Sequence, residues 1–303
     1  MSGRLNWDAD GRSWPNREFS RFVRAGGLRW HVQVFDPGYF GLGSSGRPVA
    51  LLLHGTGATT HSWRAVAPLL SQRFIVVAPD LPGHGFTGTP SSGAGFALPA
   101  VAAGVAALLR VLNLVPALVA GHSAGAAVAA RMCLDGAIAP QALVSLNGAL
   151  LPFPGLANDL FGPVARVLAG SRVAARAFAL FAGTRPSVAR LMRSTGSAID
   201  AEGMRLYGIL ASNPVHVAGA LGLMANWDLR PLMAGLPRLT TRLVLVTGGN
   251  DRMVPPSEAF RVHGLVPRAE TISLRGLGHL AHEERPGEIV ALLERLVAHE
   301  AAG

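Results

Sequence analysis

Residues 118–132 read LVAGHSAGAAVAARM, an apolar run that meets Gly121, His122, Ser123, Ala124 and Gly125 and continues as an Ala-rich helical segment. This pattern predicts a nucleophile elbow, a sharp turn between a strand and a helix that holds a serine hydroxyl above the sheet. The strained turn leaves no room for Cβ atoms two residues away on either side, so glycine is required at positions 121 and 125. Ser123 is therefore the candidate nucleophile.

Two backbone N–H groups are expected to form an oxyanion hole beside Ser123. The elbow places the N–H of Ala124 at a helix N-terminus, where the helix dipole favours a developing negative charge. The loop HGTG at 54–57 follows another apolar run and provides the second donor, the N–H of Thr56.

Because 37 of the 303 residues are glycine, the pentapeptide around Ser123 is a weak signal by itself. Its interpretation depends on the elements and catalytic partners around it.

Apolar runs and helical patterns alternate on both sides of the elbow. Two segments at 20–24 and 28–35 flank Gly26 and Gly27 as in a β-hairpin. Continuous apolar runs, typical of strands covered on both faces, occur at 49–55, 74–80, 142–148 and 242–251, and a further strand pattern at 270–279. Helical patterns lie near 62–71, 98–112, 257–265 and 286–300. The chain is therefore predicted to be an α/β protein with a mostly parallel, doubly wound sheet that begins with an N-terminal hairpin.

Three regions are expected from the distribution of these patterns. The alternation of strands and helices defines a core of residues 20–149 and 237–303. Between them, residues 150–236 form short amphipathic segments broken by Pro and Gly, which predicts an inserted helical lid. Residues 1–19 form an N-terminal arm that contains Trp7 and Trp14, and this aromatic content predicts an arm packed at least partly on the body.

A serine nucleophile needs a histidine to accept its proton and a carboxylate to orient that histidine. In a doubly wound sheet such side chains converge from loops at the carboxyl ends of strands. Asp251 directly follows the run LVLVTGGN, and His279 follows TISLRGLG. The order Ser123, Asp251, His279 is typical of hydrolases with this elbow, so these three residues form the predicted catalytic triad.

No metal or cofactor is expected. His279, His282 and Glu283 offer no pair of ligands one helical turn apart and no third arm. The single cysteine, Cys133, has no partner for an internal disulfide and is expected to be a small buried side chain.

The formal charge of +9 comes wholly from arginine, since none of the 27 basic residues is lysine. These arginines are scattered, without a basic cluster on a binding motif, so nucleic-acid binding is not expected. Polar residues interrupt the longest apolar candidate, 96–120, and residues 1–14 lack an apolar signal core. We therefore expect a cytoplasmic protein with no transmembrane segment.

Five motifs together resemble the α/β-hydrolase fold superfamily over the chain from about residue 20 onward. They are HGTG (54–57), DLPGHG (80–85), GHSAG (121–125), GGNDRMVP (248–255) and GLGH (276–279). The resemblance implies an esterase-like serine hydrolase. Because the elbow holds a serine and not an aspartate, dehalogenase and epoxide hydrolase reactions are not expected.

A narrower similarity covers nearly the whole chain, including the arm and the lid. WDADGRSWPNREFSRFVRAGGLRWHVQ (7–33), HGTGATTHSW (54–63), LNGALLPFPG (146–155), TGSAIDAEGMRLY (195–207), NPVHVAGALGLMANWDL (213–229) and GLGHLAHEERP (276–286) are similar to the magnesium-chelatase accessory proteins of bacteriochlorophyll biosynthesis. That family implies a role around magnesium insertion into protoporphyrin IX, with chelatase subunits as partners. No motif resembles a chelatase subunit itself, because there is no Walker loop and no acidic metal site.

Three functions therefore stay open: an accessory hydrolase of bacteriochlorophyll biosynthesis, a general esterase, thioesterase or carbon–carbon bond hydrolase for a small apolar substrate, and a tetrapyrrole carrier with an idle triad. Residues 150–238 hold nine arginines, four acids and many apolar side chains. Arginine binds carboxylates in a bidentate fork, so a flat apolar ring with propionates would fit between lid and core. The candidate substrate-binding residues are Trp63, Arg172, Arg176 and Trp227.

Overall fold

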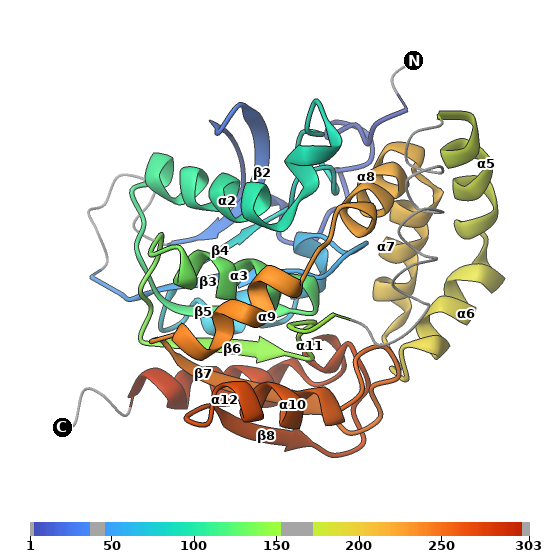
Figure 1. Ribbon diagram of the computed structural model, residues 1–303. Coiled ribbons are helices and arrows are strands. Elements are labelled where there is room, and N and C mark those ends of the chain that lie inside the picture. The colour runs from blue at the N-terminus through green and yellow to red at the C-terminus, as the bar shows by residue number, and fades with distance from the viewer. Residues whose placement is uncertain (1–2, 37–45, 153–171, 299–303) are drawn as a thin grey trace.

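The computed structural model describes residues 3–36, 46–152 and 172–298, and these residues form an α/β protein around one eight-stranded sheet (Figure 1). The strand order is β1-β2-β4-β3-β5-β6-β7-β8. The hairpin strand β2 is antiparallel to β1 and β4, and all other pairs are parallel. The strands are β1 (Ser20–Ala25), β2 (Leu28–Phe35), β3 (Val49–Leu53), β4 (Ile75–Pro79), β5 (Pro116–His122), β6 (Ala142–Leu146), β7 (Arg242–Gly248) and β8 (Glu270–Leu274). The predicted fold class is confirmed.

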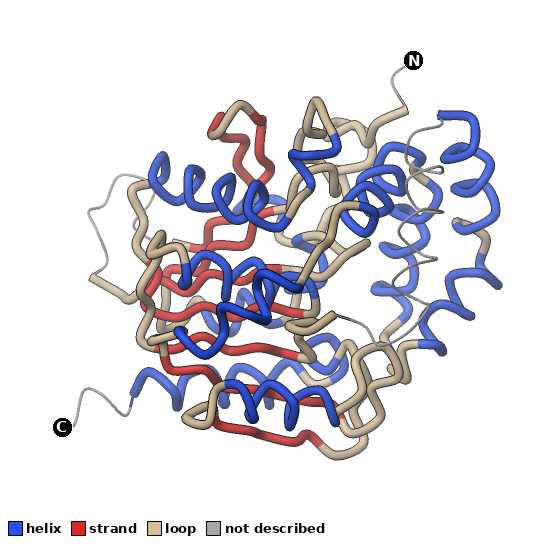
Figure 2. The backbone as a smooth tube through the Cα atoms, in the orientation of Figure 1, coloured by secondary structure: helices blue, strands red, loops and turns tan. Residues whose placement is uncertain are grey.

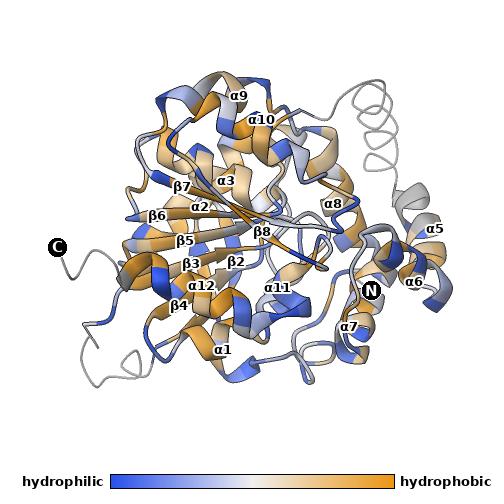
Figure 3. Cartoon of the chain, turned by 90° about the horizontal axis from the view of Figure 1, so that it is seen from below, coloured by the Kyte–Doolittle hydropathy of each residue, from blue (hydrophilic) through white to orange (hydrophobic). Residues whose placement is uncertain are grey.

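Helices cover both faces of the sheet, which explains why β3 and β4 are apolar at every position. Successive side chains of a strand point to opposite faces. Leu51 and Leu53 of β3 accordingly join one core cluster, with α2 (Leu98–Leu112), α3 (Ala124–Leu134) and α10 (Ser257–Leu265). Ala50 and Leu52 join the other, with α1 (Val66–Leu70) and α12 (Pro286–Ala298). Figure 3 shows the strands between these two apolar helix layers.

Past the carboxyl ends of the strands lies a group of helices between β6 and β7 (Figures 1 and 2). They are α5 (Arg172–Ala182), α6 (Arg185–Ser194), α7 (Ala201–Ser212) and α8 (Pro214–Ala225), and α9 (Arg230–Gly235) follows them and packs on α3. Helices α5 and α6 contact α7, and α5 also contacts α8. Residues 153–171 of the predicted lid lie outside the described residues. We call α5 to α8 the lid helices.

The predicted helix near 62–71 is wrong in its first half. Residues Thr60–Trp63 form a 3₁₀ helix, and the α-helix α1 covers only Val66–Leu70. The cause is tertiary, because the buried carboxylate of Asp80 accepts the N–H of Thr60 (2.8 Å) and the hydroxyl of Thr59 accepts the N–H of His61. These bonds fix a tight turn where propensity alone favours a longer helix.

The N-terminal arm lies on the body through its aromatic side chains. Trp14 is buried, and its Nε1–H donates to the hydroxyl of Thr60 at 3.1 Å. The Trp7 ring meets Phe22 and Phe86 edge-on, with centroids 5.3 and 4.9 Å apart. The arm therefore adds its own small apolar cluster to the molecule.

None of the described helices alone has the length and hydrophobicity of a membrane span. Only α7 and α8 counted together reach that length, and the chain bends by 85° between them.

One lid histidine ties α8 to two loops of the core. The Nδ1 of His216 accepts the N–H of Gly85 at 3.0 Å, and its Nε2–H donates to the carbonyl of Gly57 at 3.1 Å. The bond from Gly85 requires the neutral ring, because a protonated Nδ1 cannot accept a hydrogen bond, whereas the bond to Gly57 can form in either state. Burial lowers the pKa of His216 to about 4.

Acid should loosen this attachment. The pKa of a histidine in an unfolded chain is about 6.5, so the unfolded state takes up the proton first and stability is lost as the pH falls from 6.5 towards 4. For His216 alone the loss is roughly 3 kcal/mol of unfolding free energy. Urea denaturation of the wild type at pH 7.5 and pH 4.5 measures the total loss from all groups. His216→Gln, which can still donate and accept, should lose less on acidification, and an equal loss would contradict the assignment.

Candidate active site

The structure contains the predicted elbow at Ser123. Its backbone lies at φ 50° and ψ −116°, a conformation that a side chain adopts only under constraint. A Cβ on Gly121 would lie 2.5 Å from the backbone of Ala126, and one on Gly125 would overlap the carbonyl of Leu53. The two glycines are therefore required by contact as well as by the turn.

The predicted acid and base form a buried pair. The Nδ1–H of His279 donates to Oδ2 of Asp251 at 2.8 Å, which leaves Nε2 of the same ring free to accept a proton. The other carboxylate oxygen, Oδ1, accepts the N–H groups of Met253 and Val254 at 2.8 and 3.0 Å. Both side chains belong to nearly inaccessible residues, 6% exposed for Asp251 and 7% for His279. Asp251 is therefore held as a charged acceptor in one orientation.

Asn147 is a fourth partner of the Asp251 carboxylate, and the sequence reasoning did not identify it. Its Nδ2–H₂ group donates to Oδ2 of Asp251 at 2.7 Å. The side chain reaches the acid because Asn147 leaves β6 at a positive φ of 48°. The signal for this turn in the sequence was an asparagine at the end of a strand, because asparagine adopts a positive φ more readily than most residues.

The loop that carries His279 is held by the lid as well as by the core. The N–H of His279 donates to the carbonyl of Thr195 at 3.1 Å, and the N–H of Leu280 donates to the hydroxyl of Ser197 at 2.8 Å. Both acceptors lie between α6 and α7. The position of the base therefore depends on the lid.

The two predicted oxyanion donors lie on either side of the nucleophile. A Cβ on Gly55 would be 2.9 Å from Cβ of Ser123, so the loop that carries Thr56 abuts the elbow. Within the described parts of the chain, neither Thr56 N–H nor Ala124 N–H has a hydrogen-bond acceptor. His54 braces the loop, since its Nδ1–H donates to the carbonyl of Gly55 and its Nε2 accepts the N–H of Leu81, both at 2.8 Å.

No hydrogen bond joins Oγ of Ser123 to the His279 ring among the described residues. Catalytic hydrogen bonds are often long in the absence of substrate and shorten only in the complex. A nucleophile, a base and an acid in this order along the chain are the groups that nucleophilic acyl transfer requires.

A cluster of three tilted imidazole rings includes that of His279. The ring of His122 is 4.6 Å from that of His279 and 4.5 Å from that of His282. The Nε2–H of His122 donates to the carbonyl of His279 at 2.9 Å, so His122 supports the backbone of the base. Burial, with the neighbouring histidines, lowers the pKa of His122 well below its usual value and that of His282 to about 3. The sequence alone did not reveal this support, because His122 and His279 are 157 residues apart in the chain.

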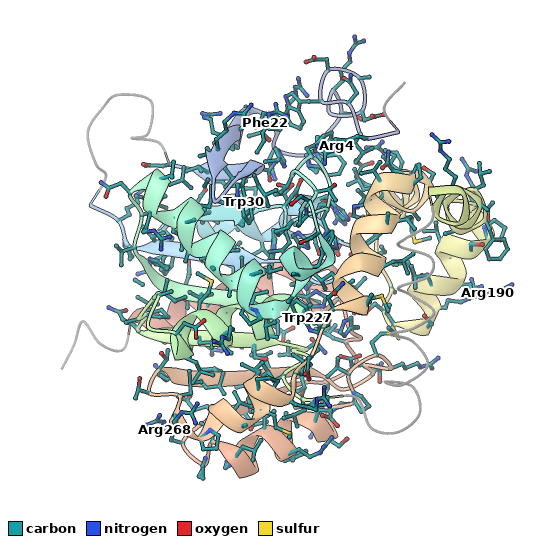
Figure 4. All side chains as sticks on the ribbon, turned by 45° about the horizontal axis from the view of Figure 1, so that its top comes forward. Arg4, Phe22, Trp30, Arg190, Trp227 and Arg268 are labelled. Atoms are coloured by element: carbon teal, nitrogen blue, oxygen red, sulfur yellow. The ribbon has the colours of Figure 1, made fainter. Side chains whose placement is uncertain are left out.

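The predicted substrate-binding residues do not gather at one site. Trp63 is fully buried in the core beside His282, at a ring distance of 4.5 Å, which disfavours contact with a substrate. Arg176 is exposed on the outer lid helix α5, and the side chain of Arg172 lies outside the described part of the structure. Trp227 is half-buried against the core, and among the described residues its enclosed Nε1–H has no acceptor (Figure 4). Of the three whose side chains the structure describes, Trp227 is the one that is neither fully buried nor exposed on the outer lid.

The side chains considered as metal ligands have other partners. The ring of His282 and the carboxylate of Glu283 both bond the hydroxyl of Ser62, at 2.7 and 2.6 Å. Glu283 also pairs with Arg64 and accepts the hydroxyl of Tyr207 at 2.8 Å. In the described part of the chain, no three His, Cys, Asp or Glu side chains form a group that could hold a metal ion.

Comparison with known proteins identifies the family to which the chain belongs. A family model described as the α/β hydrolase fold matches residues 48–286. The chain therefore belongs to the α/β-hydrolase fold family. Solved structures agree: an α/β-hydrolase fold protein from Burkholderia ambifaria superposes with a TM-score of 0.73 at 21% identity, covering 91% of this chain and 98% of that one. A hydrolase from Pseudomonas aeruginosa gives 0.72 at 19% identity, covering 92% and 98%.

Within that family the chain is similar to the magnesium-chelatase 30 kDa subunit of Rhodobacter capsulatus. The two are 38% identical over 271 residues, which is 89% of this chain and 92% of that protein. The resemblance to magnesium-chelatase accessory proteins is thus confirmed. The fold and its hydrolase neighbours support a hydrolase-type enzyme.

Replacing the acid should slow acylation without unfolding the protein. Asp251→Asn can keep the hydrogen bond to His279 but favours the wrong imidazole tautomer and removes the counter-charge, which costs about 10⁴-fold in rate in a serine triad. The measurement is the rate of p-nitrophenyl ester hydrolysis. Asp228→Asn, at an exposed residue paired only with Arg230 within the described structure, is the matched control and should keep the wild-type rate. Equal rates for both variants would remove Asp251 from the triad.

Proposed function

We propose that this protein is a serine hydrolase that cleaves an ester, thioester or related acyl bond. The observation that carries the proposal is the buried Asp251–His279 pair at the carboxyl edge of the sheet that also presents Ser123 on a strained elbow. A hydrolase fold alone would not support it, because that fold serves many functions.

In the proposed reaction, Nε2 of His279 takes the proton of Ser123 as Oγ attacks the carbonyl carbon of the substrate. The negative charge moves to the carbonyl oxygen, where the N–H groups of Thr56 and Ala124 stabilise it. The carbon–heteroatom bond then breaks, and His279 returns the proton to the leaving group. Water attacks the acyl-enzyme in the same way and releases the acid and free Ser123. Asp251 stays ionised and stabilises the imidazolium in both steps.

We place this chemistry in bacteriochlorophyll biosynthesis, in support of the chelatase that inserts magnesium into protoporphyrin IX. The support is the similarity to the chelatase 30 kDa subunit over nearly the full length of both chains. The proposed ligand is a tetrapyrrole, and the proposed partners are chelatase subunits. Trp227 is the proposed contact for the ring, because it is half-buried and the enclosed Nε1–H has no acceptor in the described structure.

Ser123 should react covalently with a fluorophosphonate probe. The reagent phosphorylates a serine only when a base removes its proton, so labelling reports on the working triad and not on the fold. We expect labelling of the wild type and none of Ser123→Ala, whereas Ser194→Ala, a change at an exposed lid residue, should label normally. An unlabelled wild type, under conditions that label an ordinary esterase, would favour the carrier function with an idle triad.

Protoporphyrin IX should bind and quench tryptophan fluorescence in a saturable way. Trp227→Phe should lower the amplitude of quenching and weaken binding, because it removes the ring nearest to the proposed ligand and its N–H donor. Trp7→Phe, in the N-terminal arm, is the matched control. Quenching that rises linearly without saturation would exclude the tetrapyrrole and leave a smaller apolar acyl substrate.

A further inference from the structure

The outer layer of the lid exposes large apolar side chains. On α5, Leu180 is 78% exposed and Phe181 is 65% exposed, and on α6 Leu191 is 48% exposed. Single exposed leucines are common on protein surfaces. An exposed Leu-Phe pair beside a third large apolar residue indicates a surface that a membrane or another molecule covers.

These side chains lie on the outward faces of α5 and α6. Among the described side chains of the two helices, Ala179, Val188 and Met192 are buried, and both helices pack on α7. At 100° per residue, Leu180 lies about 100° from Ala179, and Leu191 lies about 60° from Val188 and 100° from Met192, at the edge of the outward face. Both helices therefore turn one face to the rest of the lid and another to solvent.

Arginines share this outward surface. Arg176 on α5 and Arg185, Arg190 and Arg193 on α6 are all exposed, and Arg190 extends from the outer edge of the lid (Figure 4). Residues 172–199 contain five arginines and no aspartate or glutamate. Within the part of the chain that the structure describes, none of the four exposed arginines forms an ion pair.

We infer that the surface formed by Arg176, Leu180, Phe181, Arg190, Leu191 and Arg193, here called the outer lid face, docks on an anionic lipid surface. Helices that combine exposed Leu and Phe with arginines lie in the membrane interface, where the apolar groups enter the acyl boundary and the cations meet lipid phosphates. Charge complementarity selects the lipid, since an uncharged surface would leave the arginines without counter-ions.

Other occupants fit the outer lid face less well. A second copy of the chain would bring arginines against arginines, which disfavours association through this surface. A nucleic acid would use the arginines but would leave Leu180 and Phe181 without a role. A protein partner would need an acidic surface that also accepts Leu180 and Phe181, and the vesicle experiment below distinguishes it from lipid. The inference is independent of the proposed catalytic function, because it uses none of the triad residues.

Vesicle flotation of the full chain tests the inference. The probes are vesicles of phosphatidylcholine alone and of phosphatidylcholine with roughly one third phosphatidylglycerol. We expect the wild type to float with the anionic vesicles only, and to release when about 1 M salt shortens the Debye length to roughly 3 Å. Arg190→Glu with Arg193→Glu, and separately Leu180→Ser with Phe181→Ser, should each weaken partitioning by at least about tenfold.

Matched controls alter the same residue types elsewhere on the surface. Phe260→Ser changes a side chain that is 70% exposed on α10, and Arg268→Glu with Arg275→Glu reverses two exposed charges outside the lid. These variants should float like the wild type, and circular dichroism melts should show every variant folded. A wild type that floats with neither vesicle would overturn the inference and favour an acidic protein partner. If only the arginine double variant lost vesicle binding, the outer lid face would be a polyanion site without apolar insertion. That result would also overturn the inference.

Discussion

The strained backbone of Ser123 is the constraint on which the rest of the site depends. Holding a side chain at φ 50° costs on the order of 1–3 kcal/mol, so the surrounding structure must fix it. Hydrogen bonds on both sides do so: the N–H of Ser123 donates to the carbonyl of Leu146, and its own carbonyl accepts the N–H of Ala149, both at 3.1 Å. The nucleophile is thereby fastened to the neighbouring strand β6 and the loop that follows it.

That attachment connects the nucleophile to the acid. The segment that holds Ser123 also contains Asn147, whose amide donates to Asp251. Asp251 in turn orients His279. One short stretch after β6 therefore fixes both ends of the triad, which explains how three residues separated by long stretches of chain keep a common geometry.

The sequence predicted Ser123, Asp251 and His279 because each obeys a local rule: glycines around Ser123, and positions directly after strands for Asp251 and His279. The same reasoning found the strands from their apolar runs, and their order along the sheet emerged only in the structure. It failed where a role depends on a distant partner. From its place after the oxyanion loop, Trp63 could belong to the core or to a pocket wall, and its full burial in the core favours the first. The roles of His122 and His216 depend on contacts with segments far along the chain, which no pattern in one sequence encodes.

The bonds from the lid to the base loop have a consequence for the resting enzyme. Because Thr195 and Ser197 hold the backbone at His279 and Leu280, the lid cannot swing away as an independent flap without releasing the base. With the lid displaced, the loop at His279 would keep its bonds to Asp251 and His122 but lose two backbone hydrogen bonds. In the proposed mechanism, the alignment of the base with Ser123 therefore depends on the lid being in place.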